Sequence, residues 1–154
     1  DEARTIWEAA RNRYDGRRRS PWNDLECGDH YARPMSSWAL LEAASGFFYS
    51  APESLLRFAP RLNWDGFASF FITGTGWGRF SQQRTETGLA VKLEVLWGKV
   101  EFKTLELGLP TGITRTKLLR ADTKVEVEAG RARLKSDLPV KLEAGETLEL
   151  ELGF

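Results

Sequence analysis

Apolar residues recur at helical spacing at the start of the chain. Ile6, Ala10 and Tyr14 follow one another at steps of four residues. This spacing places the three side chains on one face and predicts a helix over residues 2–14. Residues 15–28 are rich in Arg, Pro, Asn, Asp and Gly, a composition typical of an ordered loop.

A second apolar face predicts another helix after this loop. It consists of Met35, Trp38, Leu41 and Ala44. Gly46 follows as a suitable C-terminal stop. The start has two candidates. Asp29 is a good N-cap by residue type, but Pro34 would then lie past the first turn and cost a hydrogen bond. A start at Arg33 puts the proline at the first helical position, and we favour it.

Beyond Phe47 the helical period fades, and by Leu89 the apolar period has become two. The apolar set of this run is Leu89, Val91, Leu93, Val95 and Trp97. Gly98-Lys99 is expected to turn the chain into a further alternating stretch, and a slip of parity at residues 104–105 predicts a bulge. Later alternating segments are 125–127, 132–134, 140–142 and 148–152, with glycine turns between them. This spacing favours an antiparallel β-sandwich.

The sequence therefore predicts an α+β fold, with two helices followed by an antiparallel, sandwich-like β region. Two helices cannot cover their own apolar faces, so they need the β region or further helices as partners. The chain begins at Asp1, without a methionine and inside a predicted helix. We therefore expect it to be a piece of a longer protein.

Charge and length weigh against several classes of partner. Lys and Arg number 22, and so do Asp and Glu, so the whole chain has no field that would attract nucleic acid or an anionic membrane. The basic run at residues 17–19 is short enough to be a solvated loop. No apolar stretch reaches the length of about eighteen residues that a membrane span requires, so no membrane span is expected.

The scarcity of cysteine and histidine limits the possible chemistry. Cys27 is the only cysteine, which excludes an internal disulfide and favours a reducing, cytoplasmic location. His30 is the only histidine, so the usual four-ligand zinc site cannot be assembled from these two residue types. We expect neither a metal nor a cofactor.

The segment PWNDLECGDHYAR, residues 21–33, is the richest in candidate chemistry. It gathers carboxylates, an amide, a guanidinium and aromatic rings, in Trp22, Asn23, Asp24, Glu26, Asp29, His30, Tyr31 and Arg33. Such groups suit a pyranose, whose hydroxyls need donors and acceptors and whose C–H face stacks on aromatic rings. The plainer alternative is a loop at the start of a helix, whose carboxylates cap N–H groups and pair with the arginines at 17–19.

The string WNDLECGDHYARPMSSWALLEAASGFFY resembles the signature near the C-terminus of glycoside hydrolase family 116. The likeness continues through PRLNWDGFASFFITGTGWGRFSQ and covers roughly residues 10–83. This family contains β-glucosidases, β-xylosidases and the non-lysosomal glucosylceramidase. The resemblance implies that residues 1–46 are the last helices of an (α/α)6 toroid and that residues 47–83 form an aromatic-rich connecting hairpin region. Residues 84–154, a C-terminal β-rich region, resemble the tail of some members much more weakly.

The resemblance also implies which residues of this chain bind sugar. Family members are retaining enzymes, and the resemblance places their nucleophilic glutamate and acidic aspartate upstream of Asp1, so no catalytic residue is assigned here. Asp24 and Arg33 match the carboxylate and arginine that hold the glucose 6-hydroxyl in the −1 subsite. The family usually has glutamate where Asp24 stands, and the shorter side chain leaves xylose open as the sugar. Possible second-layer support comes from Glu26, Asp29, His30 and Tyr31, for which capping and ion pairing are the alternatives.

These observations predict the C-terminal part of a retaining β-glycosidase, inactive by itself, with a β-glucoside or β-xyloside and the upstream catalytic domain as partners. A non-catalytic carbohydrate-binding β-sandwich is the alternative, and a structural β domain that braces its neighbour is a third. Aromatic residues crowd between positions 47 and 80 and form either a core or a stacking platform for sugars. Trp64 and Trp77 are the candidates for such a platform.

Overall fold

The computed structural model describes residues 2–13, 17, 35–118, 125–128 and 130–154. The chain divides into two compact units, Asp1–Leu40 and Leu41–Phe154. Helix α1 (Glu2–Arg13) belongs to the first unit and confirms the predicted helix. All its described residues are exposed, and Arg4 donates a hydrogen bond of 2.8 Å to Glu8 one turn later. None of the described helices is long and apolar enough to cross a membrane.

Helix α2 (Met35–Ser45) confirms the second predicted helix. It ends where Gly46 adopts a left-handed conformation with φ of 58°, as the sequence predicted. The predicted start at Arg33 lies outside the described residues, and so does the predicted loop from residue 18 onward.

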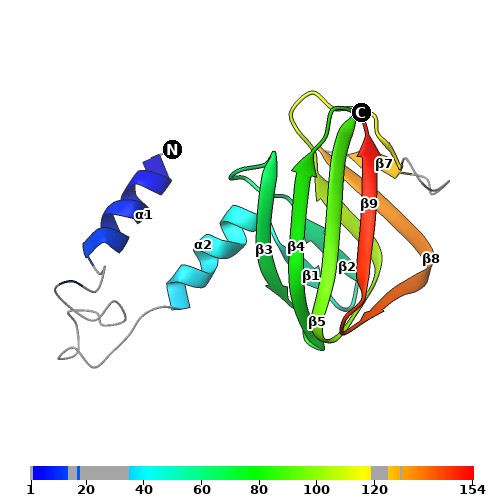
Figure 1. The fold of residues 1–154 in the computed structure, drawn as a ribbon, viewed down its shortest axis with the longest axis horizontal. Coiled ribbons are helices and arrows are strands. Elements are labelled where there is room, and N and C mark those ends of the chain that lie inside the picture. The colour runs from blue at the N-terminus through cyan, green and yellow to red at the C-terminus, as the bar shows by residue number, and fades with distance from the viewer. Residues whose placement is uncertain (1, 14–16, 18–34, 119–124, 129) are drawn as a thin grey trace. The chain divides into compact units, whose positions relative to one another are not determined.

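Most of the second unit is β-strand. The strands are β1 (Phe48–Ser50), β2 (Leu55–Phe58), β3 (Gly66–Ile72), β4 (Gly76–Arg84), β5 (Gly88–Gly108), β6 (Lys117–Leu118), β7 (Val125–Glu128), β8 (Arg131–Glu143) and β9 (Thr147–Gly153). They form one curled sheet that folds over into two layers (Figure 1). The front layer pairs β3, β4, β5 and β9 in that order, with β6 beside β9. The back layer pairs β1, β2, β5 and β8, with β7 beside β8. Only the pairing of β2 with β5 is parallel among the described strands.

Strand β5 belongs to both layers, and this corrects the hairpin expected at Gly98-Lys99. Its first half pairs with β4 and β9, and its second half pairs with β2 and β8, so the two halves do not pair with each other. Gly98 has φ of 70°, and a Cβ there would collide with the carbonyl oxygen of Thr75. The glycine therefore bends one strand between two layers. The predicted bulge is confirmed by a register shift between Phe102 and Thr104.

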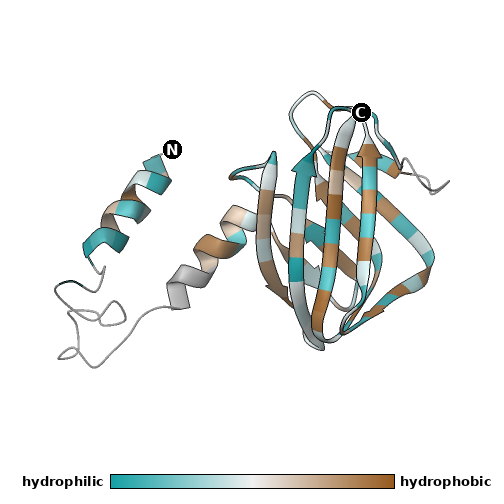
Figure 2. Cartoon of the chain, in the orientation of Figure 1, coloured by the Kyte–Doolittle hydropathy of each residue, from teal (hydrophilic) through white to brown (hydrophobic). Residues whose placement is uncertain are grey.

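The core lies between the layers, where apolar and polar side chains alternate along the strands (Figure 2). Phe58 of the back layer stacks on Phe80 of the front layer with ring centroids 3.9 Å apart and planes 2° from parallel. Phe71 contacts Phe58 edge-on at 5.5 Å. All three rings come from the aromatic-rich region, so these members of it form a core.

Candidate functional site

All the sugar-binding candidates named from the motif lie outside the described residues. These are Asp24 and Arg33, with Glu26, Asp29, His30 and Tyr31 as their possible support. The described geometry begins with the helix that follows them. The surfaces that remain as candidates are the end of α2 and the two outer faces of the curled sheet.

The last turn of α2 is held by its own serine. Ser45 is 1% exposed, and its hydroxyl donates a 2.8 Å hydrogen bond to the carbonyl oxygen of Leu41. The same hydroxyl accepts a 3.2 Å hydrogen bond from the backbone N–H of Phe47. These two bonds fix the way in which the chain leaves the helix and enters β1.

The segment after β2 completes this attachment. The backbone N–H of Ala59 donates to the carbonyl oxygen of Ser45 at 3.1 Å, and that of Arg61 donates to Ala44 at 2.9 Å. A Cβ on Gly46 would collide with the backbone of Ala59, so only glycine allows this approach. We call this set of contacts the helix clamp. It satisfies carbonyl groups that the end of a helix otherwise leaves without partners.

Of the two platform candidates, Trp64 serves the core. Its indole N–H donates to the carbonyl oxygen of Gly108 at 3.2 Å, and its ring packs against the buried cluster. Its own carbonyl oxygen accepts a 2.7 Å hydrogen bond from Gln82. The indole N–H and the backbone carbonyl of Trp64 therefore both make hydrogen bonds to neighbouring strands.

Trp77 is different, because it is 42% exposed on the outer face of β4. It lies directly opposite Trp97 of β5, which is 63% exposed. The periodic pattern placed Trp97 in one set with the buried Val95, and this was wrong. The register shifts between Trp77 and Gly78, so Leu96 is an extra residue and Trp97 turns to the outside. No local sequence signal marks this bulge.

Further along β4 from the tryptophan pair, the outer face of the front layer is hollowed into a groove of about 630 Å³. We call it the outer groove. Its floor consists of the small residues Gly66, Ala68, Ser81 and Ala90. Long side chains border it, namely Arg79, Gln83, Lys92, Glu149 and Glu151. Small residues in the middle of a face with long residues around them leave a space that a ligand can enter.

The border of the outer groove carries both signs of charge. The ammonium of Lys92 lies 3.0 Å from Glu94 and 3.9 Å from Glu149. Arg79 is exposed and makes no ion pair with any side chain of the described part. Its guanidinium therefore keeps its donors available, two residues along β4 from Trp77.

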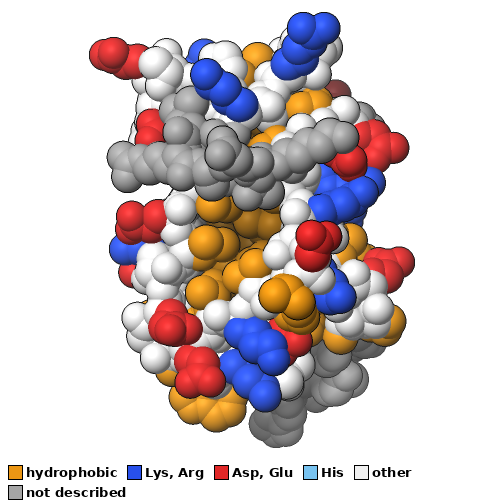
Figure 3. Space-filling model, turned by 90° about the vertical axis from the view of Figure 1, so that its right-hand side faces the viewer, with side chains coloured by type: hydrophobic (Ala, Val, Ile, Leu, Met, Phe, Trp, Pro, Cys, Tyr) orange, Lys and Arg blue, Asp and Glu red, His pale blue; other side chains and the backbone are white. Residues whose placement is uncertain are grey.

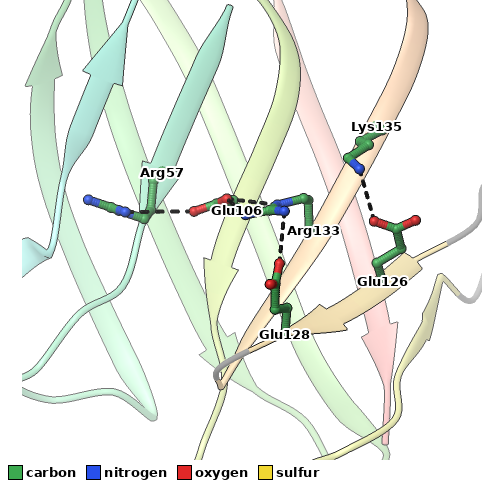
Figure 4. A network of polar contacts seen from close by, with 6 residues as sticks. All are labelled: Arg57, Glu106, Glu126, Glu128, Arg133 and Lys135. Atoms are coloured by element: carbon green, nitrogen blue, oxygen red, sulfur yellow. Dashed lines mark hydrogen bonds and ion pairs between the residues drawn. The ribbon is translucent and has the colours of Figure 1, made fainter. Parts of the chain in front are cut away.

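The outer face of the back layer holds a network around one buried carboxylate (Figure 4). Glu106 is 3% exposed, and its Oε1 accepts a 2.8 Å hydrogen bond from Nε of Arg133 and forms a 2.7 Å ion pair with Nη2 of the same guanidinium. Its Oε2 faces Arg57 at 3.7 Å. Arg133 also contacts Glu128 at 2.9 Å, and Lys135 contacts Glu126 at 3.0 Å. The hydrogen bond that Arg133 donates to Glu106, followed by the attraction of the carboxylate charge, raises the pKa of Arg133.

The charged groups of this network pair with one another. Oε1 of Glu106 is bonded to Arg133 and Oε2 lies toward Arg57 at 3.7 Å, so both oxygens are directed at guanidinium groups of the protein. A buried carboxylate can mark an active site, but here its partners account for its burial. We assign a structural role to the back-layer network.

Two further features of the described residues provide no site. Figure 3 shows apolar side chains in a hollow at the edge where β8 and β9 lie. Val140, Leu148 and Leu150 of these strands are partly buried and pack against the core, so these apolar side chains belong to the core of the unit. The described residues include no group of three or more His, Cys, Asp or Glu that could hold a metal ion.

Comparison with known proteins finds no matching family model, no matching curated protein and no matching solved structure.

Proposed function

We propose that this chain is the C-terminal part of a retaining β-glycosidase similar to family 116, and that it contributes Asp24 and Arg33 to the −1 subsite. The proposal is supported by the ECGDHYAR motif and by the helix clamp that follows it in the chain. In this proposal the nucleophile and the acid come from an upstream catalytic domain. The substrate is a β-glucoside or a β-xyloside, and no cofactor takes part.

The helix clamp is the structural observation that carries this proposal. A binding group has to be held within about 0.5 Å of its productive position. Arg33 precedes α2 by two residues, and the far end of α2 is bonded to the strand region through Ala59 and Arg61. The β unit thus holds the last turn of the helix that follows the sugar-binding motif in the chain.

The side chain at position 24 sets the expected sugar. Aspartate keeps the charge of the family's usual glutamate but is one methylene shorter. A direct hydrogen bond to the 6-hydroxyl of glucose is then weakened or bridged by water. Xylose has no 6-hydroxymethyl group, so a xyloside loses nothing by this change. We therefore propose that the complete enzyme accepts both sugars.

The test is to replace Arg33 by alanine in the complete enzyme and to measure kcat/KM on matched aryl β-glucosides and β-xylosides. A hydrogen bond to a charged group contributes about 1.5–3 kcal/mol, so kcat/KM on the glucoside should fall roughly tenfold to a hundredfold. The fall on the xyloside should be much smaller. Equal losses on the two substrates would contradict the role of Arg33 at the 6-hydroxyl.

The control variant is Arg61→Ala. Arg61 is exposed, and it joins the helix clamp only through its backbone N–H, which alanine keeps. We expect both activities to stay unchanged. A second measurement concerns the isolated chain, which should not turn over either substrate. Turnover that disappears when a carboxylate of this chain is replaced would refute the assignment of the catalytic pair to an upstream domain.

A further inference from the structure

We infer that the outer groove and the tryptophan pair beside it form a second carbohydrate site, which binds a linear oligosaccharide of uncharged pyranoses. This site lies wholly within the β unit and uses neither Asp24 nor Arg33. It therefore goes beyond the proposed function and can fail or succeed independently of it.

The tryptophan pair supplies an apolar surface for sugar rings. Trp77 and Trp97 are directly opposite on neighbouring antiparallel strands, where side chains start only about 5 Å apart. They are 42% and 63% exposed, and neither ring contacts another aromatic ring of the described part. Ile72, opposite Trp77 on β3, is 54% exposed and widens the same surface. Indole rings left open in this way can stack on the C–H faces of pyranoses.

The outer groove continues this surface in the direction of β4. Along that strand the outward side chains are those of Trp77, Arg79, Ser81 and Gln83. At about 3.4 Å per residue, the stretch from Trp77 to Gln83 measures roughly 20 Å. That length exceeds a single sugar ring, so the ligand that fills it is a chain of several sugars.

The polar border suits hydroxyl groups. Arg79 and Gln83 are exposed and offer donors along one strand, and Gln83 also offers an acceptor. Glu149 of β9 offers acceptors on the other side of the floor. Sugar hydroxyls donate and accept at once, so a border that contains both kinds of group can bind them on either side.

The charges of the border argue for an uncharged ligand. Arg79 and Lys92 are balanced by Glu94, Glu149 and Glu151, so a polyanion would meet more acidic than basic groups. The floor of small residues is bordered by side chains with hydrogen-bonding groups, which suits a ligand rich in hydroxyl groups.

The test is calorimetric titration of the 154-residue chain with cellohexaose and with xylohexaose. We expect at least one of them to bind. Replacing Trp77 or Trp97 by alanine should raise the Kd about tenfold, the effect of about 1.4 kcal/mol of lost stacking and burial. Arg79→Ala should raise it severalfold. The matched control is Trp7→Ala, because Trp7 is 41% exposed on α1 and lies outside the groove.

Two further variants distinguish a lost sugar contact from a lost fold, and the outer groove from the motif. Trp77→Phe keeps an aromatic ring and should retain most of the binding, which shows that a loss in Trp77→Ala is not a loss of fold. Arg33→Ala should leave hexasaccharide binding unchanged, whatever it does to hydrolysis in the complete enzyme.

Three results would overturn the inference. The first is that the unaltered chain binds neither hexasaccharide at millimolar concentration. The second is binding that survives both Trp77→Ala and Trp97→Ala. The third is a dimer in sedimentation that either substitution turns into a monomer, because the tryptophan pair would then be a contact between protein chains.

Discussion

The outer faces of the two layers use charge in opposite ways. On the back layer, Arg57, Glu106, Arg133 and Glu126 stand side by side in one row across four strands. The buried carboxylate in this row is held by the guanidinium on either side of it. On the front layer, charged side chains border a floor of small residues, and the guanidinium of Arg79 pairs with no side chain of the described residues. On one face the buried carboxylate is held by charged partners within the protein, and the other face retains bonding capacity for a ligand.

The aromatic residues of the two faces show the same difference. Phe48 of the back layer is 40% exposed, almost the same as the 42% of Trp77 on the front layer. The guanidinium of Arg57 lies over the ring of Phe48, 4.6 Å from its centroid. A cation above the ring face occupies the surface on which a sugar would stack. Exposure alone therefore does not identify a binding platform, and the partner of the ring has to be considered as well.

The largest expected effect is on stability, and it separates the two arginines at the centre of this comparison. Arg133→Ala leaves the buried carboxylate of Glu106 with only the 3.7 Å contact to Arg57. An unsatisfied buried charged acceptor costs about 2 kcal/mol, which corresponds to a fall in Tm of roughly 5–10 °C. Arg79→Ala removes an exposed side chain without an ion pair and should leave Tm unchanged. Thermal melting followed by circular dichroism measures both variants.

The pH dependence of this difference follows from the pKa of Arg133, which the hydrogen bond to Glu106 raises. A group with a raised pKa contributes its full stabilisation below its ordinary pKa and loses it only as the pH rises through the folded value. That window lies at strongly alkaline pH. The difference in Tm between Arg133→Ala and Arg79→Ala should therefore be the same at neutral and at mildly alkaline pH. A difference that disappears at mildly alkaline pH would contradict the stabilising role of the contact between Arg133 and Glu106.

Much of the fold could be predicted because its signals are local. The helical spacing around Ile6 and the glycine at position 46 mark α1 and the end of α2. The alternation from Leu89 onward marks β5, and the parity slip marks its bulge. The prediction of the fold failed where residues distant in the sequence decide the structure. Gly98 has the sequence of a turn, yet the strands that pair with each half of β5 make it a bend between layers.

The same reason explains what the sequence missed in the candidate site. Trp97 continues the alternation of Val95, so nothing nearby reveals that a bulge against β4 turns it outward. The outer groove depends on which small residues share a face across β3, β4 and β5, and that depends on strand order. The motif around Asp24 and Arg33 was visible in the sequence, and its role remains a prediction.

A smaller effect on stability is expected at the exposed end of the back-layer network. Glu128→Ala removes one contact of Arg133, but the side chain of Glu128 is 68% exposed, and the hydrogen bond and the ion pair from Arg133 to Glu106 remain. Exposed ion pairs contribute about 0.2–1 kcal/mol and are screened by salt. The Tm should fall slightly at low salt and not at all at high salt. A loss as large as that of Arg133→Ala would show that the network acts as a unit rather than around Glu106.

The smallest expected effect on stability is also the sharpest test of the front layer. Ala90→Leu adds a branched side chain to the floor of the outer groove, where there is open space rather than a packed core. Substitutions at such surface positions change stability by within about 0.5 kcal/mol, so Tm should stay where it is. Hexasaccharide binding should nevertheless weaken, because the added atoms fill the space in which the sugar chain would lie. Ser136→Leu is the matched control, since Ser136 is exposed on β8 and does not line the groove. If Ala90→Leu keeps both Tm and binding, the outer groove is only a hollow in the surface, and the difference between the two faces is one of charge pairing alone.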